Sequence, residues 1–286
     1  MTAVIELSFE PLLQLGQLVI RWQTIATTVA LLVALGLCGW RVSRHGALRM
    51  DDLLLILVGI VPGAVVGGRL VHVLAFLDAY LARPMAVVDP RVGSLSLLGA
   101  VLGGIGGALY VTRLLRAPAR AWADIAALPL LLALGLGKVA QLFGGSGQGA
   151  PFDGPWAIAF TGAGPWVSAN AELPSHPAQL YEALWLLLPV PFVALRGYAR
   201  RLWWRIRRRT PPDVYSGRAF VAVLAWFLAG RVLVGFAWRD AGLIGPFNAE
   251  QLLALAALGV TLGLVGRVIV KPTEGKPRPA AREPTR

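Results

Sequence analysis

The sequence contains a single cysteine, Cys38, in 286 residues, so no disulfide bond can form within the chain. Charged residues are also scarce, because they make up 15% of the chain where a soluble domain carries about 25%. Hydrophobic residues account for 56% of the sequence, and the mean hydropathy is +0.65. This composition excludes a disordered chain, a fibrous protein and almost any ordinary globular enzyme, and it predicts a membrane protein.

Acidic residues are outnumbered, since 15 Asp and Glu stand against 27 Lys and Arg and give a formal net charge of +12. In a polytopic membrane protein such an excess arises from the loops that stay in the cytoplasm, so we expect no nucleic-acid partner. The N-terminal segment carries Glu6 and Glu10 where a cleavable signal peptide has positive charge, and we expect no cleavage there. No internal repeat is visible, which argues against a transporter built from inverted halves.

Long apolar runs are the main feature that is present. A bilayer core about 30 Å thick is crossed by about 20 helical residues, and seven runs approach that length: 22–40, 53–76, 92–111, 123–143, 180–195, 219–238 and 251–270. The sequence therefore predicts an all-α polytopic membrane protein with about seven transmembrane helices, in one bundle over residues 1–270. Glycines at four-residue spacing, such as Gly59, Gly63 and Gly67, predict close helix packing.

The distribution of basic residues predicts the orientation of this bundle. Lys and Arg cluster in the loops 41–50, 112–122 and 196–218 and in the tail 271–286, whereas the alternate segments hold only Arg83, Arg91 and Arg239. Positively charged loops are retained in the cytoplasm. We therefore expect the N-terminus outside, the C-terminus in the cytoplasm, an extracytoplasmic segment at about 144–176 and a disordered cytoplasmic tail over 271–286.

Three cations, Arg69, Lys138 and Arg231, fall deep within the predicted spans. Each costs at least about 2.5 to 3.5 kcal/mol at a helix centre, and the acids placed to pair with them are Glu182 and, less deeply, Asp124. This count predicts buried positive charge without a protein partner, for which a phospholipid phosphate is the abundant anion in a membrane.

Two polar segments accompany these cations. The segment 175–182 opens the fifth span and places His176, Gln179 and Glu182 on one broad helix face. The segment 137–149 ends the fourth span in a glycine-rich turn, whose backbone N–H groups are of the kind that cradles an anion.

At these residues the chain resembles the phosphatidylglycerol:prolipoprotein diacylglyceryl transferase family of bacterial inner membranes. The similarity runs through 20–22, 67–70, 93–104, 137–149, 175–182, Arg231 and 251–252, and its most specific piece is the run from His176 to Glu182. Seven spans with the N-terminus outside also agree with that family.

The resemblance implies a reaction and its partners. The family transfers the diacylglyceryl group of phosphatidylglycerol to the thiol of a lipobox cysteine in prolipoproteins, which forms a thioether and releases glycerol phosphate. It implies no cofactor and no metal, and a multi-pass location in the bacterial cytoplasmic (inner) membrane. Because the reacting thiol belongs to the substrate protein, we expect Cys38 to be inert.

The resemblance also implies roles for individual residues. Arg231, Lys138 and His176 are the predicted catalytic residues. Phosphatidylglycerol is expected to bind to Lys138, Gln141, Gly149, Arg231 and Arg69. Gln179, Tyr181, Glu182 and His72 are expected to support the site, and either His72 or His176 is expected to deprotonate the thiol.

The chain departs from the family pattern at several positions that carry function. The replacements are Gln23 for tyrosine, Leu98 for histidine, Lys138 for arginine, Gln141 for asparagine, and Ser146 and Gly235 for glutamates. Two alternatives to an active transferase therefore stay open: a catalytically impaired paralogue that binds anionic phospholipid, and a transporter of anionic lipid.

Overall fold

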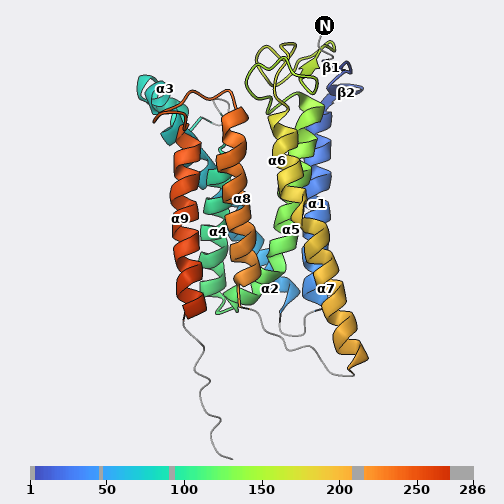
Figure 1. Ribbon diagram of the computed structural model, residues 1–286, viewed down its shortest axis with the longest axis vertical. Helices are drawn as coiled ribbons and strands as arrows, with labels where there is room; N and C mark the ends of the chain where they lie inside the picture. Colours follow the sequence, from blue (N-terminus) through green and yellow to red (C-terminus); the bar gives the residue numbers. More distant parts are fainter. Residues whose placement is uncertain (1–3, 45–47, 90–93, 208–215, 271–286) are drawn as a thin grey trace, which may run out of the picture.

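The computed structural model describes residues 4–44, 48–89, 94–207 and 216–270, and it is a bundle of long helices (Figure 1). The α-helices are α1 Trp22–Ser43, α2 Met50–Ala75, α3 Leu77–Ala82, α4 Leu97–Leu114, α5 Ala119–Ala140, α6 Ala178–Leu187, α7 Pro189–Ile206, α8 Arg218–Val234 and α9 Ala249–Val270. Three short 3₁₀ helices join them: η1 Pro84–Val87, η2 Gln141–Gly144 and η3 Gly235–Ala237.

Six helical segments of the described chain are long and apolar enough to cross a bilayer. They are Trp22–Ser43, Met50–Ala75, Leu97–Leu114, Ala119–Gly144, Ala178–Gly197 and Arg218–Ala237. The seventh predicted span falls in α9, where a shorter apolar stretch, Ala249–Gly263, was found. A polytopic helical membrane protein is thus confirmed; the start of the third predicted span at residue 92 and the tail 271–286 lie outside the described residues.

The predicted close packing of glycine-bearing helices is confirmed between α2 and α4. Along this interface Gly59 lies against Gly107, Gly63 against Gly103 and Gly67 against Gly99. In each pair a backbone carbonyl oxygen of one helix occupies the place that a β-carbon on the other would need. Only glycine permits this approach, because any side chain would push the two backbones apart.

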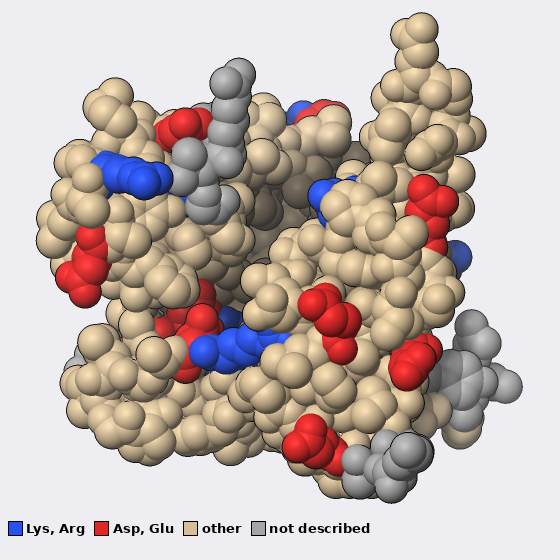
Figure 2. Space-filling view, turned by 90° about the horizontal axis from the view of Figure 1, so that it is seen from above, with Lys and Arg blue, Asp and Glu red and all other residues tan. Residues whose placement is uncertain are grey.

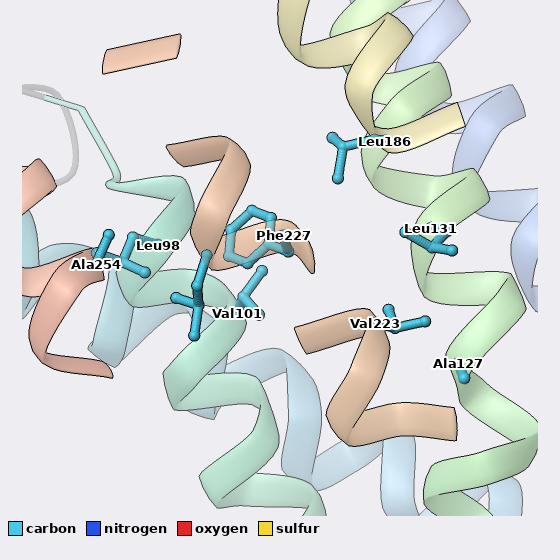
Figure 3. Close-up of a cluster of buried hydrophobic side chains, with 9 residues drawn as sticks. Leu98, Val101, Ala127, Leu131, Leu186, Val223, Phe227 and Ala254 are labelled. Atoms are coloured by element: carbon cyan, nitrogen blue, oxygen red, sulfur yellow. The ribbon is translucent and has the colours of Figure 1, made fainter. Parts of the chain in front are cut away.

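A buried apolar cluster joins α4, α5, α6, α8 and α9, and Figure 3 shows its side chains. Phe227 and Leu228 of α8 are almost fully buried in it, as is Leu131 of α5. Leu98 of α4 is also 0% exposed and lies beside Ala254 of α9. The cluster fixes the spacing of these five helices.

Asp124 does not pair with a deep cation, so that expectation is wrong. Its carboxylate accepts hydrogen bonds from the backbone N–H groups of Ser216, Gly217, Ala219 and Phe220. These groups belong to the start of α8, where helical N–H groups have no partner within the helix. Asp124 therefore caps the N-terminus of α8, where its negative charge interacts favourably with the positive end of the helix dipole.

Small strands cover one end of the bundle, and the all-α prediction omitted them. Strand β1 (Ile5–Leu7) pairs in parallel with β4 (Ile158–Phe160), and β2 (Leu12–Leu15) forms a hairpin with β3 (Leu18–Arg21). In Figure 1 these strands lie together with the N-terminus and the segment between α5 and α6. We call this the strand-bearing end; α5 and α8 finish there, and α6 and α9 begin there.

Substitution of Gly103 by alanine tests the α2–α4 interface. The new methyl group would collide with the Gly63 carbonyl, and overpacking of this kind costs about 1 to 3 kcal/mol. We expect a lower thermal unfolding temperature for the purified protein. Gly106→Ala, one turn away and with no atom within 4 Å of the added carbon, is the matched control; equal unfolding temperatures for the two variants would contradict the proposed role of the close approach.

Candidate active site

Four charged side chains meet near the strand-bearing end of the bundle. Glu182, in α6, forms ion pairs with Lys138 of α5 and with Arg231 of α8, and the Lys138 Nζ–Glu182 Oε2 distance is 2.6 Å. Arg231 also pairs with Glu250 of α9. The side chains of Lys138 and Glu182 are 5% and 3% exposed, so this ion pair is screened little by water. We call these four residues the charge cluster.

The start of α9 is built so that Glu250 reaches Arg231. Asn248 and Gln251 form a reciprocal cap, in which each side-chain oxygen accepts the backbone N–H of the other residue, at 2.8 and 2.9 Å. The Gln251 Nε2 group donates to the Val232 carbonyl at 2.9 Å. The cap thus joins the start of α9 to the end of α8. Gln251 directly follows Glu250 and Val232 directly follows Arg231, so this contact lies beside both members of the ion pair.

Trp238 covers the charge cluster just after η3. Its indole ring lies 4.9 Å from Lys138 Nζ and 5.7 Å from the Arg231 guanidinium carbon, and its Nε1–H donates to Glu182 Oε1 at 3.2 Å. An aromatic face stabilises a cation without adding a negative charge. The ring therefore supports both cations while leaving their remaining donors available.

The prediction of unpaired buried positive charge is wrong for Lys138 and Arg231. Two carboxylates, Glu182 and Glu250, balance these two cations. Sequence reasoning missed Glu250 because an acid in the first turn of a helix is usually explained by the helix dipole. It also missed Trp238, for which the chain offers no local signal.

Arg69 is not part of the charge cluster. Its guanidinium donates to backbone carbonyls of the loop after α3, at 2.8 Å to Val87 and 3.0 Å to Asp89, with a further bond to Ala86. Its guanidinium also lies 5.3 Å from the Tyr80 ring. Arg69 therefore does not join Lys138 and Arg231 as expected for a shared phospholipid site, because its guanidinium holds the loop between α3 and α4.

His72, one turn after Arg69 in α2, also contacts the connection between α3 and α4. Its Nε2 accepts the backbone N–H of Ser94 at 3.3 Å, and its ring packs against Phe76 and Tyr80. The lone pair of this nitrogen is therefore already used by the protein.

Three glutamines have a buried amide atom without a partner in the described part of the chain, and two of them, Gln141 and Gln179, flank Gly147. Gln179 is 0% exposed, and neither its Oε1 nor its Nε2 has a hydrogen-bond partner there; the same holds for Gln141 Oε1. Gly147 lies between them and approaches both glutamines and the Trp238 ring. Buried amides without partners are costly, and here they are suited to the hydroxyl or phosphate oxygens of a ligand.

Backbone groups of the glycine-rich turn after α5 form hydrogen bonds within the protein. The N–H groups of Gly145 and Ser146 donate to the carbonyls of Leu142 and Gln141. Gly149 N–H donates to the His176 carbonyl at 2.7 Å, and the Gly149 carbonyl accepts from Arg239 Nε at 2.6 Å. The expected cradling of an anion by Gly149 is therefore not what the structure shows, since both its backbone groups are engaged.

Arg239 fastens the segment between α5 and α6 to the bundle. Besides Gly149, its guanidinium donates to the Ala169 carbonyl at 2.6 Å and to Ser175 Oγ at 2.9 Å. Ser175 is 0% exposed and immediately precedes the run from His176 to Glu182, the most specific piece of the resemblance. Sequence reasoning counted Arg239 only as a topology signal, because its three acceptors are up to 90 residues away.

His176 lies outside the charge cluster, on the wall formed by the same segment. Its Nδ1 is 3.1 Å from the Tyr181 hydroxyl, and its ring stacks on Phe152 with centroids 4.0 Å apart. The Tyr181 hydroxyl also accepts from Trp156 Nε1 at 2.8 Å. Of the residues expected to support the site, Tyr181 therefore contacts His176, whereas Glu182 pairs with the cations. Loss of hydration lowers the pKa of His176 below its usual value.

A cavity opens beside Glu250 at the strand-bearing end. It is lined by the end of α2 (Ala75 and Phe76), by residues 240–243 of the α8–α9 loop and by residues 248–250. Figure 2, which views the bundle from this end, shows a hollowed surface with acidic and basic side chains close together. The charge cluster is therefore connected, through Glu250, to an opening of the molecule.

The sequence also matches a known protein family. The sequence model for prolipoprotein diacylglyceryl transferase matches residues 10–267, which include the whole charge cluster. The chain belongs to the prolipoprotein diacylglyceryl transferase family.

Similar proteins of the family come from several bacteria. A phosphatidylglycerol–prolipoprotein diacylglyceryl transferase of Geobacter sulfurreducens is 32% identical, over 91% of this chain and 96% of that protein. Proteins with the same name from Methylocella silvestris and Gluconacetobacter diazotrophicus are 35% and 31% identical. They cover 80% and 95% of this chain and 93% and 95% of their own lengths.

The residues expected to depart from the family pattern make local contacts in the structure. Ser146 Oγ donates to Gln23 Oε1 at 3.0 Å, so two of these residues bind each other. The space beside Gly235 is filled by the Gln251 side chain, 2.6 Å from where a β-carbon would stand. Leu98 belongs to the apolar cluster of α4, α8 and α9, where a charged imidazole would have no partner among the cluster residues.

Substitution of Glu182 by glutamine tests the charge cluster of this transferase. The change leaves two buried cations without their shared carboxylate, and loss of one partner of a buried pair costs about 3 to 5 kcal/mol. We expect a marked fall in unfolding temperature. Glu172→Gln, which changes an exposed carboxylate of the segment between α5 and α6, is the matched control; an unfolding temperature of Glu182→Gln as high as that of the control would refute the arrangement.

The lowered pKa of His176 predicts a pH dependence of stability. The folded protein favours the neutral imidazole. The contribution of His176 to the free energy of unfolding is therefore complete above pH 6.5, the ordinary pKa of histidine, and it is lost as the pH falls through the lower pKa of the folded state. We expect the unfolding temperature of the wild type to fall below pH 6.5 more steeply than that of His176→Phe, which keeps the ring on Phe152. Parallel profiles for the two proteins would contradict the prediction.

Proposed function

We propose that this protein transfers the diacylglyceryl group of phosphatidylglycerol to the lipobox cysteine thiol of prolipoproteins. Membership of the transferase family and the names of its relatives support this activity. We further propose that it lies in the bacterial inner membrane with seven spans, the N-terminus outside and the C-terminus in the cytoplasm. The distribution of arginine and lysine along the loops supports this orientation.

The observation that carries the proposal is the pair of buried cations held by one carboxylate next to unpartnered amides. In our proposal Lys138 and Arg231 bind the lipid phosphate, and Gln141 and Gln179 bind oxygens of the headgroup. Arg231 Nε has no hydrogen-bond partner among the described residues, so the guanidinium has a donor to offer. Glu182 and Trp238 hold the two cations in place.

These cations suit the charge that the reaction develops. The substrate sulfur forms a bond with the terminal glycerol carbon of the diacylglyceryl group, and the bond from that carbon to the phosphate oxygen breaks. The bonding electrons stay with the phosphate, so the leaving glycerol phosphate gains one negative charge. Fixed cations in a dry site stabilise such developing charge strongly. Lys138 does so as a point charge, because an ammonium lacks the two-pronged geometry of arginine.

Other predicted site residues keep positioning roles in this proposal. His176 and Tyr181 contact each other where the segment between α5 and α6 enters α6. Arg69 and His72 bind backbone groups of the loop between α3 and α4. Gly149 is required where three chain segments cross, because a β-carbon there would collide with the Ala237 carbonyl.

Incubation of the purified protein with phosphatidylglycerol vesicles and a lipobox peptide tests the activity. We expect a mass gain of one diacylglyceryl group on the peptide cysteine and release of glycerol phosphate. Lipid binding without product would favour a non-catalytic lipid binder, and movement of lipid between leaflets without product would favour a transporter; either result contradicts the proposal.

Substitution of Lys138 by methionine tests the phosphate site in the same assay. Removal of a preorganised charge-stabilising donor lowers turnover by about 10²- to 10³-fold, and we expect a loss of this size. Lys138→Arg restores the charge and should retain most of the rate. Arg83→Met removes an exposed arginine near the same end and is the control. A Lys138→Met rate within threefold of the control would exclude Lys138 from the phosphate site.

A further inference from the structure

Glu250 differs from Glu182 in its surroundings, although both carboxylates pair with Arg231. Glu182 is 3% exposed and is held by Lys138, Arg231 and Trp238. The Glu250 side chain is 18% exposed, and among the described residues Arg231 is its single ion-pair partner. Glu250 also lines the cavity at the strand-bearing end. Of the two carboxylates, Glu250 is thus the more exposed and the one held by fewer partners.

The charge count of the cluster requires one carboxylate to give way when phosphate binds. Two cations face two carboxylates, so a phosphate that joins them adds an uncompensated negative charge. The Arg231 Nη2 group that bonds Glu250 is of the kind that binds phosphate oxygens. A phosphate that takes this donor displaces Glu250 toward the cavity, because Glu182 is held by three donors and is more deeply buried.

Once displaced, Glu250 faces another acid. Asp240 lines the same cavity, and loss of hydration together with the negative charge of Glu250 raises the pKa of Asp240. Two carboxylates that share a site without a cation between them bind a proton more readily than either alone. The charged and titratable groups that face Glu250 are Arg231 from α8, Lys138 from α5, His72 from α2 and Asp240 from the α8–α9 loop.

The two histidines are less suited to receive a proton from a thiol at this place. His72 Nε2 already accepts the Ser94 N–H, and it loses that bond if it takes a proton. His176 bonds Tyr181 and stacks on Phe152, and it forms no ion pair with the charge cluster in the part of the chain that the structure describes.

We propose that Glu250 is a catalytic residue of this transferase: the lipid phosphate displaces it from Arg231, and it then accepts the proton of the incoming thiol. The inference rests on the proposed function. The S–H bond breaks and its proton goes to a Glu250 carboxylate oxygen, the sulfur electron pair forms the bond to the glycerol carbon, and the phosphate leaves with the electrons of the broken C–O bond. Phosphate binding thereby activates the proton acceptor, so the thiol is deprotonated only when lipid is present.

Turnover of Glu250→Gln as a function of pH tests this role. General-base catalysis contributes about 10²- to 10⁴-fold, so we expect a loss of at least about 100-fold at pH 7. Without the carboxylate the reaction depends on preformed thiolate, whose amount rises about tenfold per pH unit up to a pKa of about 8.5. The defect should shrink by the same factor as the pH rises. Glu250→Asp, which keeps the carboxylate, should retain much more of the rate, and Glu172→Gln is the matched control.

Binding of phosphatidylglycerol vesicles separates this role from a structural one. Because Glu250→Gln removes the anion that competes for Arg231, the variant should bind these vesicles at least as tightly as the wild type. A rate close to the control, a defect that stays constant with pH, or a loss of lipid binding together with activity would each overturn the proposal. If the wild type itself transfers nothing, the proposed function fails, which is a different result from an active wild type with an active Glu250→Gln.

Discussion

The buried carboxylate of Glu182 is the contact on which the arrangement of the site depends. It joins the end of α5 to the end of α8 through Lys138 and Arg231, and the indole of Trp238 closes over the same group. Charges in such surroundings are costly to bury, and they are tolerated only when each has a partner of good geometry. Glu182 thus holds both cations in place, while Arg231 Nε keeps a donor that no described residue uses. The pair of cations is therefore able to bind another anion.

The layer above the charge cluster is fixed by contacts of a different kind. Hydrogen bonds from Arg239 and the backbone crossing at Gly149 attach the segment between α5 and α6 to the bundle. The pairing of β1 with β4 then fastens the N-terminal residues to that segment. These contacts satisfy backbone groups that lie outside the helices, as is necessary wherever irregular chain is withdrawn from water. They also hold the site covered on one side, with the cavity beside Glu250 as an opening.

The residues expected to depart from the family pattern are joined to the rest of the site by local contacts. Gln23 and Ser146 bind each other, and Gln251 fills the space that the absence of a side chain at Gly235 leaves. The Arg231 guanidinium, which has no acid four residues further along its own helix, obtains a second carboxylate from Glu250 on α9. Contacts of this kind are expected in a tightly packed polar site, because a missing partner would leave a buried charge or an empty space.

The length of the apolar runs determined that the chain is a polytopic helical membrane protein, and glycine spacing determined that α2 can approach another helix closely, because both properties are local and periodic. The resemblance directed attention to Lys138, Arg231 and the run from His176 to Glu182, and the structure brings the two cations together with Glu182. Only the tertiary structure decided the partners: Glu250 for Arg231, the α8 cap for Asp124, and loop carbonyls for Arg69. The reason is geometric, since an ion pair requires charged nitrogen and oxygen atoms within about 4 Å of each other. Which side chains come that close is set by the packing of whole helices, and no short stretch of sequence encodes that packing.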